Sequence, residues 1–414
     1  MTEFAANLER YMDVILRVGV NLQPGQPVTI GSGRGIPLEF ADVVRLLARR
    51  AYDLGASSVN VTWTDPAVDR LWFERATSEA LQTPSKARVA LAQEFIDAHA
   101  AFVGLIGADP DAFAGVDPAR MGMAMKAQAL ASSSIQQQIG SSVVPWVGAA
   151  IASPAWARKV FPDKAPDEAL TALWSHIFHA TRVDTPDPVA TWKAHSEELG
   201  HRVDALDRAH FARLRYRGPG TDLIIELPAR HRWIGGGATD SRGIYFVPNI
   251  PTEEVFSAPQ RNGVNGTVRG TMPVLLQGTV VDGVSLRFED GRIVAYDATR
   301  GREALGHLIE TDEGSRYLGE VALVTSDSPT FATFPLYNTL YDENVSCHLA
   351  IGNAYPECIE GAHEMTPEQL VEAGANRSAA HWDFMVGSPE LEIDGETADG
   401  QRTPIIRSGA WMLR

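Results

Sequence analysis

The chain has 414 residues, of which 44% are hydrophobic and 21% charged, and its net charge is −16. This composition is typical of a folded globular protein, and the length favours two or more domains. The acidic balance argues against nucleic acid or an anionic membrane as a partner, because binding to either needs concentrated Lys and Arg. A surplus of carboxylates fits an enzyme that binds cations, although such groups also form plain solvated surface.

The cysteines and the N-terminus favour a cytoplasmic location. Cys347 and Cys358 are too few to staple a chain of this length and form no CxxC pair, which indicates a reducing compartment. The N-terminal residues lack the basic start and apolar centre of a signal peptide. The uncharged stretch at 127–157 is interrupted by Ser, Gln and Pro, so we expect no membrane span there.

The N-terminal half alternates between helical and strand patterns. The pattern predicts, in chain order, a helix to about residue 18, a strand at 27–30, a helix at 38–54, a strand at 58–63, a helix at 86–98 and a strand at 101–106. Gly55 follows the second helix, as is typical of a helix end. Strands separated by helices pair in parallel, so this half is expected to be an α/β layer structure.

The C-terminal half shows a different pattern. It predicts strands at 223–227, 278–281, 284–289 and 293–298, and a helix at 301–308. Asp282-Gly283 and Asp290-Gly291 stand between successive strands, and Asp-Gly is a strong hairpin signal. The pattern changes after a helical stretch that ends near residue 213. We therefore expect a mixed α/β and α+β fold, with an N-terminal α/β domain at 1–214 and a β-rich domain at 215–414.

Two adjacent carboxylates, Glu253 and Glu254, lie inside the otherwise apolar stretch 249–256. One interpretation is a solvated helix start, because Thr252 followed by acidic residues resembles a capping pattern. From the pair alone this interpretation is the more common case. The alternative is a functional pair of carboxylates.

Glu320 and His348 are further candidates. Glu320 stands just before a strongly apolar strand, where it either faces water at the strand end or belongs to a site. A lone histidine beside apolar residues is usually satisfied within the fold, and His348 with the adjacent Cys347 does not define a zinc site. We expect Cys347 to be buried, and Tyr355 is of a type that more often packs than binds a ligand.

His381 and Asp383 form an H-x-D pair in an apolar segment. On a strand, residues i and i+2 face the same side, so these two side chains are expected to project together. Trp382 and Phe384 would then pack on the opposite face. Such a pair is either half of a metal site or an ordinary hydrogen-bonded pair.

Taken together, the candidates supply carboxylates, imidazoles and a phenol: Glu253, Glu254, Glu320, His348, Tyr355, His381 and Asp383. Carboxylates and imidazoles without thiolates suit zinc, cobalt, manganese or magnesium. A pair of such ions needs one bridging carboxylate and several terminal ligands. A site of this kind activates a hydrolytic water and stabilises the developing oxyanion.

These segments resemble a known family. PTEEVF, TDEGSRYLGEVAL, YNTLYDENVSCHLAIGNAY and HWDFMVGS, in this order, are similar to the M29 family of thermophilic-type metallo-aminopeptidases, the aminopeptidase T/S family. The likeness covers nearly the whole chain, since VGVNLQPGQPV and WARKVFPD in the first half also resemble family sequence. The segment between the LGE and CHLA motifs is one residue shorter than is usual in the family. This difference affects the expected shape of the pocket but removes none of the expected metal ligands.

The resemblance implies a role for each candidate. The metal ligands would be Glu254, Glu320 as the bridging carboxylate, His348, His381 and Asp383. Glu253 would be the general base. Tyr355 would lie close to the metals, either as a ligand or as a donor to the oxyanion. The residues alone leave open which of the paired glutamates binds metal and which group binds the substrate α-amine.

The expected function is therefore metal-dependent release of N-terminal amino acids from peptides, carried out by the C-terminal domain with two divalent ions per subunit. The resemblance also implies a homodimer. An amidase acting on non-peptide substrates and a non-catalytic metal-binding homologue are the alternatives. Nucleotide binding at Gly31, Gly33 and Gly35 is a weaker one, because the tract lacks GxGxxG spacing and a Walker lysine.

Overall fold

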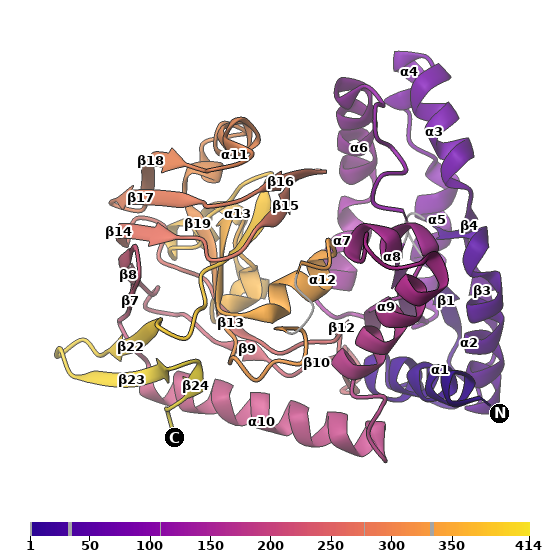
Figure 1. Ribbon diagram of the computed structural model, residues 1–414, viewed down its shortest axis with the longest axis horizontal. Helices are drawn as coiled ribbons and strands as arrows, with labels where there is room; N and C mark the ends of the chain where they lie inside the picture. Colours follow the sequence, from indigo (N-terminus) through magenta and orange to yellow (C-terminus); the bar gives the residue numbers. More distant parts are fainter. Residues whose placement is uncertain (1, 32–34, 108, 277, 332–334) are drawn as a thin grey trace. The chain divides into compact units, whose positions relative to one another are not determined.

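The computed structural model describes residues 2–31, 35–107, 109–276, 278–331 and 335–414. The chain forms two compact units, of which unit 1 comprises Met1–Lys193 and Gly237–Pro251, and unit 2 comprises Ala194–Gly236 and Thr252–Arg414 (Figure 1). Ser32, Gly33 and Arg34 of the glycine-rich tract lie outside the described residues. No helix of the described chain is long and apolar enough to cross a membrane.

Unit 1 is built around a parallel sheet. Its helices are α1 (Glu3–Val14), α2 (Ala41–Asp53), α3 (Pro66–Arg75), α4 (Ser78–Leu81), α5 (Lys86–Asp97), α6 (Pro118–Ala131), α7 (Ser133–Gly140), α8 (Pro154–Val160) and α9 (Pro166–Ala180), with a π-helical turn at Ile15–Gly19 and a 3-10 turn at Leu38–Phe40. Its strands are β1 (Val28–Ile30), β2 (Ile36–Pro37), β3 (Val59–Val61), β4 (Trp63–Thr64), β5 (Ala101–Ile106), β6 (Trp146–Ala150), β10 (Ala238–Thr239), β11 (Tyr245–Phe246) and β12 (Asn249–Ile250).

The 5-stranded sheet of unit 1 has the order β12-β6-β5-β1-β3, and every pairing in it is parallel. The predicted α/β layer structure is therefore confirmed, and each predicted strand of the first half overlaps an observed one. One of the two edge strands, β12, comes from the chain that returns to unit 1 after residue 236. Helix α10 (Pro188–Ala209) contains the point where the chain passes from unit 1 to unit 2.

Unit 2 is rich in antiparallel strands. These are β7 (Arg213–Gly218), β8 (Thr221–Glu226), β9 (Ile234–Gly235), β13 (Val255–Ser257), β14 (Val264–Arg269), β15 (Val274–Leu276), β16 (Thr279–Val281), β17 (Ser285–Glu289), β18 (Arg292–Asp297), β19 (Leu318–Leu323), β20 (His348–Gly352), β21 (His381–Met385), β22 (Glu392–Glu396), β23 (Arg402–Arg407) and β24 (Ala410–Trp411). Its helices after α10 are α11 (Arg302–Ile309), α12 (Thr339–Asp342) and α13 (Pro367–Glu372), with 3-10 turns at Gly314–Arg316, Glu343–Val345, Pro356–Cys358 and Ala362–Glu364.

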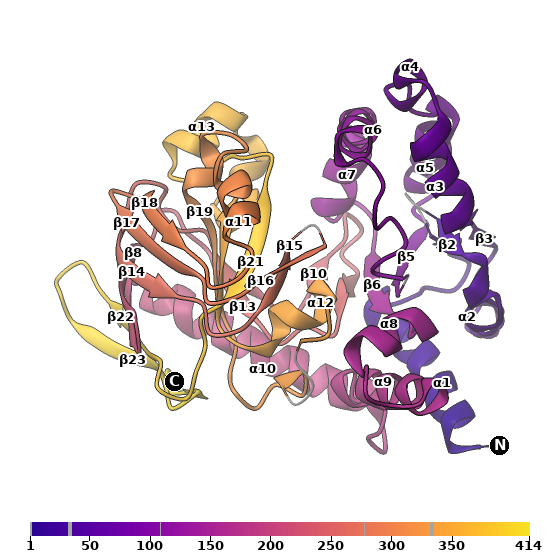
Figure 2. The same cartoon turned by 45° about the horizontal axis from the view of Figure 1, so that its top comes forward.

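Two sheets make up most of unit 2 (Figure 2). One has 5 strands in the order β21-β20-β19-β13-β9, and the other has 8 in the order β18-β17-β14-β8-β7-β22-β23-β24. Apolar side chains of both sheets belong to one core, which includes Leu223 and Ile225 of the larger sheet and Val321, Leu349 and Phe384 of the smaller one. The smaller sheet therefore buries one face in this core and has its other face available for polar residues.

One of the predicted hairpins is observed and the other is wrong. Asp290-Gly291 joins β17 to β18, which pair antiparallel. Asp282-Gly283 does not form a hairpin, because β16 pairs with β15 while β17 pairs with β14 and β18. Asp282 instead bridges to Arg300, so this Asp-Gly turn passes the chain from one sheet to another. The turn signal was local, whereas the choice of strand partner depends on the packing of the sheets.

Candidate metal centre

The polar face of the smaller sheet in unit 2 carries the candidate residues. Glu320 is a buried residue within β19, not a strand-end residue facing water. The register of β19 against β20 shifts between Leu318 and Glu320. Bulges of this kind redirect a side chain, and here Leu318 and Val321 both reach the core while Glu320 points away from it. A Cβ at Gly319 would meet the backbone oxygen of Asn353, so the bulge requires glycine there.

Strand register places the acidic groups in one row. Ala350 of β20 is opposite Glu320 on one side and Asp383 on the other. Gly352, two residues further along β20, is opposite His381 of β21. Beyond His348, the middle strand thus has the small residues Ala350 and Gly352 in this row, which leaves room for the larger polar side chains of both neighbouring strands. Trp382 and Phe384 face the core, as the alternation of the segment predicted.

The ligand atoms of the cluster converge. Nε2 of His348 lies 3.1 Å from Oε2 of Glu254 and 3.6 Å from Oε1 of Glu320. Nε2 of His381 lies 3.4 Å from Oε2 of Glu320 and 3.4 Å from Oδ1 of Asp383. In each of two groups, Glu254–Glu320–His348 and Glu320–His381–Asp383, the potential ligand atoms lie within 4.8 Å of one another. Glu320 belongs to both groups, and each of its oxygens faces a different histidine.

Backbone carbonyls orient both imidazoles. Nδ1 of His348 lies 3.2 Å from the oxygen of Ser346, and Nδ1 of His381 lies 2.8 Å from the oxygen of Asn353. A carbonyl oxygen only accepts, so each Nδ1 carries a proton and donates it. The neutral form of each ring then presents the lone pair of Nε2 to the carboxylates, which is the arrangement that metal-binding histidines adopt.

The charges of the cluster favour a cation. Burial acts to lower the pKa of His381, but Asp383 and Glu320 raise it to about 11. Burial acts to raise the pKa of Glu320, yet His348 and His381 hold it at about 2. In the metal-free protein, protons on Nε2 therefore compensate the carboxylates. Oε2 of Glu254 is buried and has His348 Nε2 at 3.1 Å, but among the described residues no well-formed hydrogen bond satisfies it. These features fit a site for a divalent metal ion.

Glu253 and Tyr355 lie outside both groups. Strand β13 begins at Val255, directly after the paired glutamates, so the interpretation of this segment as a helix start is wrong. Glu253 and Glu254 are both buried. The ring of Tyr355 lies 5.1 Å from that of His381 and 5.5 Å from that of Phe256, between centroids. Tyr355 is 44% exposed, and its ring contacts His381 of the cluster.

Cys347 is a buried free cysteine, as expected, and its Sγ lies 3.3 Å from the oxygen of Val324. Cys358 is also buried and free. Neither cysteine belongs to the groups of potential metal ligands found among the described residues. The centre therefore depends on oxygen and nitrogen ligands.

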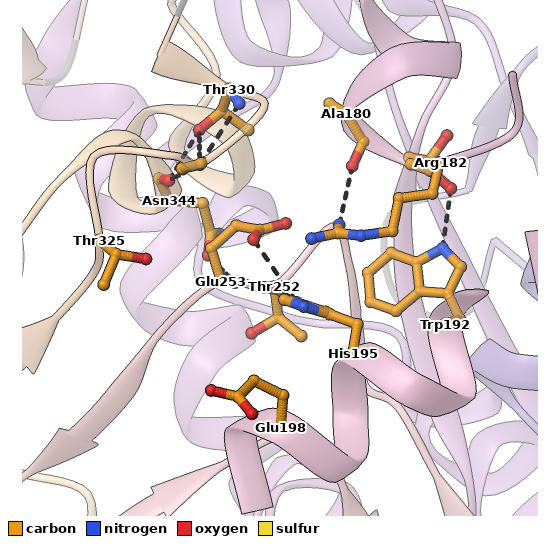
Figure 3. Close-up of polar contacts among 12 residues, drawn as sticks. Ala180, Arg182, Trp192, His195, Glu198, Thr252, Glu253, Thr325, Thr330 and Asn344 are labelled. Atoms are coloured by element: carbon orange, nitrogen blue, oxygen red, sulfur yellow. Dashed lines mark hydrogen bonds and ion pairs between the residues drawn. The ribbon is translucent and has the colours of Figure 1, made fainter. Parts of the chain in front are cut away.

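Sequence reasoning missed some residues beside the centre. Burial, with the charges of Glu254 and Asp383, raises the pKa of Glu343 well above its ordinary value. Glu343 is thus a further acidic group whose titration depends on the charges of the cluster, and its place in the same segment as His348 was the available signal. His195 of α10 and Asn344 contact the chain at Thr252 and Glu253 (Figure 3). A lone histidine in a helical segment carries no such signal.

An antiparallel sheet that holds two overlapping carboxylate–histidine groups is an arrangement suited to the metal sites of hydrolytic enzymes. Residues 4–411 match the model of the thermophilic metalloprotease family, M29. The chain belongs to this family.

Individual relatives cover the whole chain. It is 43% identical over 414 residues to aminopeptidase 2 of Geobacillus stearothermophilus. The aligned region covers 100% of this chain and 99% of the relative. It is also 43% identical to aminopeptidase AmpS of Bacillus subtilis, over 100% of both chains. The solved structure of wild-type AmpT from Thermus thermophilus has a TM-score of 0.91 and 40% identity, covering 99% of this chain and 100% of that one.

Proposed function

We propose that this protein is a metal-dependent aminopeptidase that releases N-terminal amino acids from peptides by attack of water. The observation that carries the proposal is the pair of ligand groups joined by Glu320, in a chain similar over its whole length to aminopeptidases. The chemistry is assigned to the C-terminal half. The division of the chain at residue 215 stays a prediction.

The proposed metal ligands are Glu254, Glu320, His348, His381 and Asp383, with Tyr355 as a further ligand or a donor. Divalent ions held there would supply Lewis acidity, which lowers the pKa of water and polarises the scissile carbonyl. We propose two ions per subunit, since the two oxygens of Glu320 face different histidines. Zinc, cobalt, manganese and magnesium all suit such ligands.

Glu253 and Tyr355 would act on the reacting groups. Glu253 would take a proton from the attacking water and deliver it to the leaving amine. Burial, with the charges of Glu320 and Asp383, raises the pKa of the Tyr355 hydroxyl above its ordinary value. Tyr355 is therefore protonated at neutral pH and can donate a hydrogen bond to the oxygen of the scissile carbonyl as it gains negative charge.

Matched peptides test this function. The protein should cleave a peptide with a free N-terminus and release its first residue, as mass spectrometry of the products would show. Chelation should abolish the cleavage, and a divalent ion should restore it. The same peptide with an acetylated N-terminus should resist cleavage. Equal cleavage of both peptides would overturn the aminopeptidase proposal and favour a less selective amidase.

We further propose that the protein is cytoplasmic and forms a homodimer. The two free, buried cysteines are consistent with a reducing compartment. The homodimer rests on the resemblance to the family. Light scattering of the purified protein tests it, and a fully active monomer would contradict an obligatory dimer.

A further inference from the structure

The backbone of Glu253 is held by a buried asparagine. Its N–H donates to Oδ1 of Asn344 over 2.6 Å (Figure 3). Asn344 is fully buried, and its Nδ2 donates to the oxygen of Leu340 over 2.9 Å. The carbonyl of Asn344 accepts hydrogen bonds from Ser328 and Thr330. The main chain at Glu253 is thus fixed to a well-anchored partner.

The side chain of Glu253 meets a histidine from another element. Nε2 of His195, on α10, lies 2.8 Å from the oxygen of Thr252 and 3.5 Å from Oε2 of Glu253. The carbonyl of Thr252 only accepts, so Nε2 carries the proton. The N–H that is directed at the Thr252 carbonyl therefore also lies close to the carboxylate of Glu253. Both side chains are largely buried, with 16% and 7% exposed respectively.

We propose that His195 is a positioning residue for Glu253, holding its carboxylate in one orientation through this Nε2–H. This inference rests on the proposed function, in which Glu253 is the general base. A glutamate side chain has several rotatable bonds, and a base works only from a narrow range of positions. Misplacing a catalytic group by about 1 Å can slow a reaction by roughly a hundredfold. The contact from His195 removes this freedom before substrate binds.

Substitutions at His195 test the proposal. In the metal-loaded protein, His195→Ala should lower kcat by roughly 10- to 100-fold, with KM and metal content near those of the wild type. His195→Gln should recover most of kcat, because the Nε2 of glutamine can donate from a similar place. His201→Ala is the matched control, since His201 is an exposed residue of the same helix. Unchanged kcat in His195→Ala, or a loss of metal together with kcat, would overturn the positioning role.

A double variant tests whether His195 acts through Glu253. Adding His195→Ala to Glu253→Gln should lower kcat no further, because the base is already absent. If the two losses multiply, His195 acts independently and the proposal is wrong. His195→Phe, which keeps a ring but removes the N–H, replaces His195→Ala in this comparison if the alanine variant folds poorly.

A spectroscopic measurement separates this inference from the proposed function. In the chelated protein with isotope-labelled histidine, the imidazole nitrogens of His195 should show a proton on Nε2, and Glu253→Gln should shift that resonance. This result is expected even if the protein cleaves no peptide, so failure of the aminopeptidase proposal would be seen separately. If the Glu253→Gln substitution left the His195 resonance unchanged, the contact between His195 and Glu253 would be contradicted.

Discussion

Two buried carboxylates of unit 2, Glu320 and Glu396, have similarly lowered pKa values but different surroundings. Glu320 lies in β19 among histidines and other acids. Glu396 lies at the end of β22 among arginines, with Arg215 Nε at 2.6 Å, Arg402 Nε at 2.8 Å and Arg213 Nη1 at 3.5 Å. The pKa of each carboxyl is lowered to about 2, for Glu320 by its histidines against the effect of burial and for Glu396 by Arg215 and Arg402. The lowered pKa alone therefore does not reveal which carboxylate is functional.

The partners distinguish the two clusters. Guanidinium groups keep their protons at any working pH, so the cluster of Glu396 is balanced by fixed charges. The cluster of Glu320 is balanced by protons on His348 and His381, and it contains more acids than histidines. A metal ion can displace those protons but cannot displace an arginine. An acidic cluster whose charge depends on removable protons is thus the better indicator of a metal centre.

The largest expected effect comes from Glu253, beside the cluster of Glu320. Glu253→Gln removes the proposed base and should lower turnover by about 10²- to 10⁴-fold, while metal analysis of the purified variant finds the wild-type content. Glu254→Gln should lose metal as well. If Glu253→Gln loses metal and Glu254→Gln keeps it, the roles of the paired glutamates are reversed.

A smaller effect is expected on stability from metal binding. At a metal concentration a hundredfold above Kd, the loaded protein should gain about 2.7 kcal/mol over the chelated protein. Calorimetry near neutral pH should show this as a higher Tm. If the Tm were the same with and without metal at every pH, the residues around Glu320 would not form one metal-binding cluster.

The pH dependence of that difference follows from the histidines. His381 has a pKa of about 11 in the folded, metal-free protein and an ordinary value of 6.5. Its proton therefore stabilises the metal-free fold fully below about pH 6.5, and this contribution is lost as the pH rises toward 11. Lowering the pH should shrink the Tm difference between loaded and chelated protein, because protons compete with metal. A difference that grows on acidification would contradict this.

The smallest effect is expected at the arginine cluster. Glu396→Gln should destabilise the protein by about 1 kcal/mol, because its partly exposed arginines are screened by water. The pKa of Glu396 is lowered from 4.5 to about 2, so its contribution is present above pH 4.5 and is lost as the pH falls toward 2. Denaturant unfolding at neutral pH and near pH 3 should show the variant and wild type converging in acid. Turnover at neutral pH should be unchanged.

Much of the fold and part of the centre could be predicted from local pattern. The period-2 alternation of His381, Trp382, Asp383 and Phe384 indicated both the polar and the core face of β21. Helices alternating with strands indicated the parallel sheet of unit 1. These predictions succeeded because neighbours in the sequence determine them.

The remaining features depend on contacts between distant segments. The bulge at Gly319 that turns Glu320 away from the core breaks the alternation, so periodicity could not place it. His195 meets Thr252 across 57 positions, and nothing around His195 in the sequence indicates that contact. The Asp282-Gly283 turn was misinterpreted for the same reason, because the strand partners of β16 and β17 are set by the sheets.

Metal binding by paired variants tests the comparison most directly. Equilibrium dialysis against a divalent ion should be followed by metal analysis for the wild type, Glu320→Gln and Glu396→Gln, each checked for folding. We expect Glu396→Gln to bind as much metal as the wild type, and Glu320→Gln to bind little, because it removes the carboxylate shared by both ligand groups. Wild-type metal binding by a folded Glu320→Gln variant would contradict the assignment of this cluster as the metal centre.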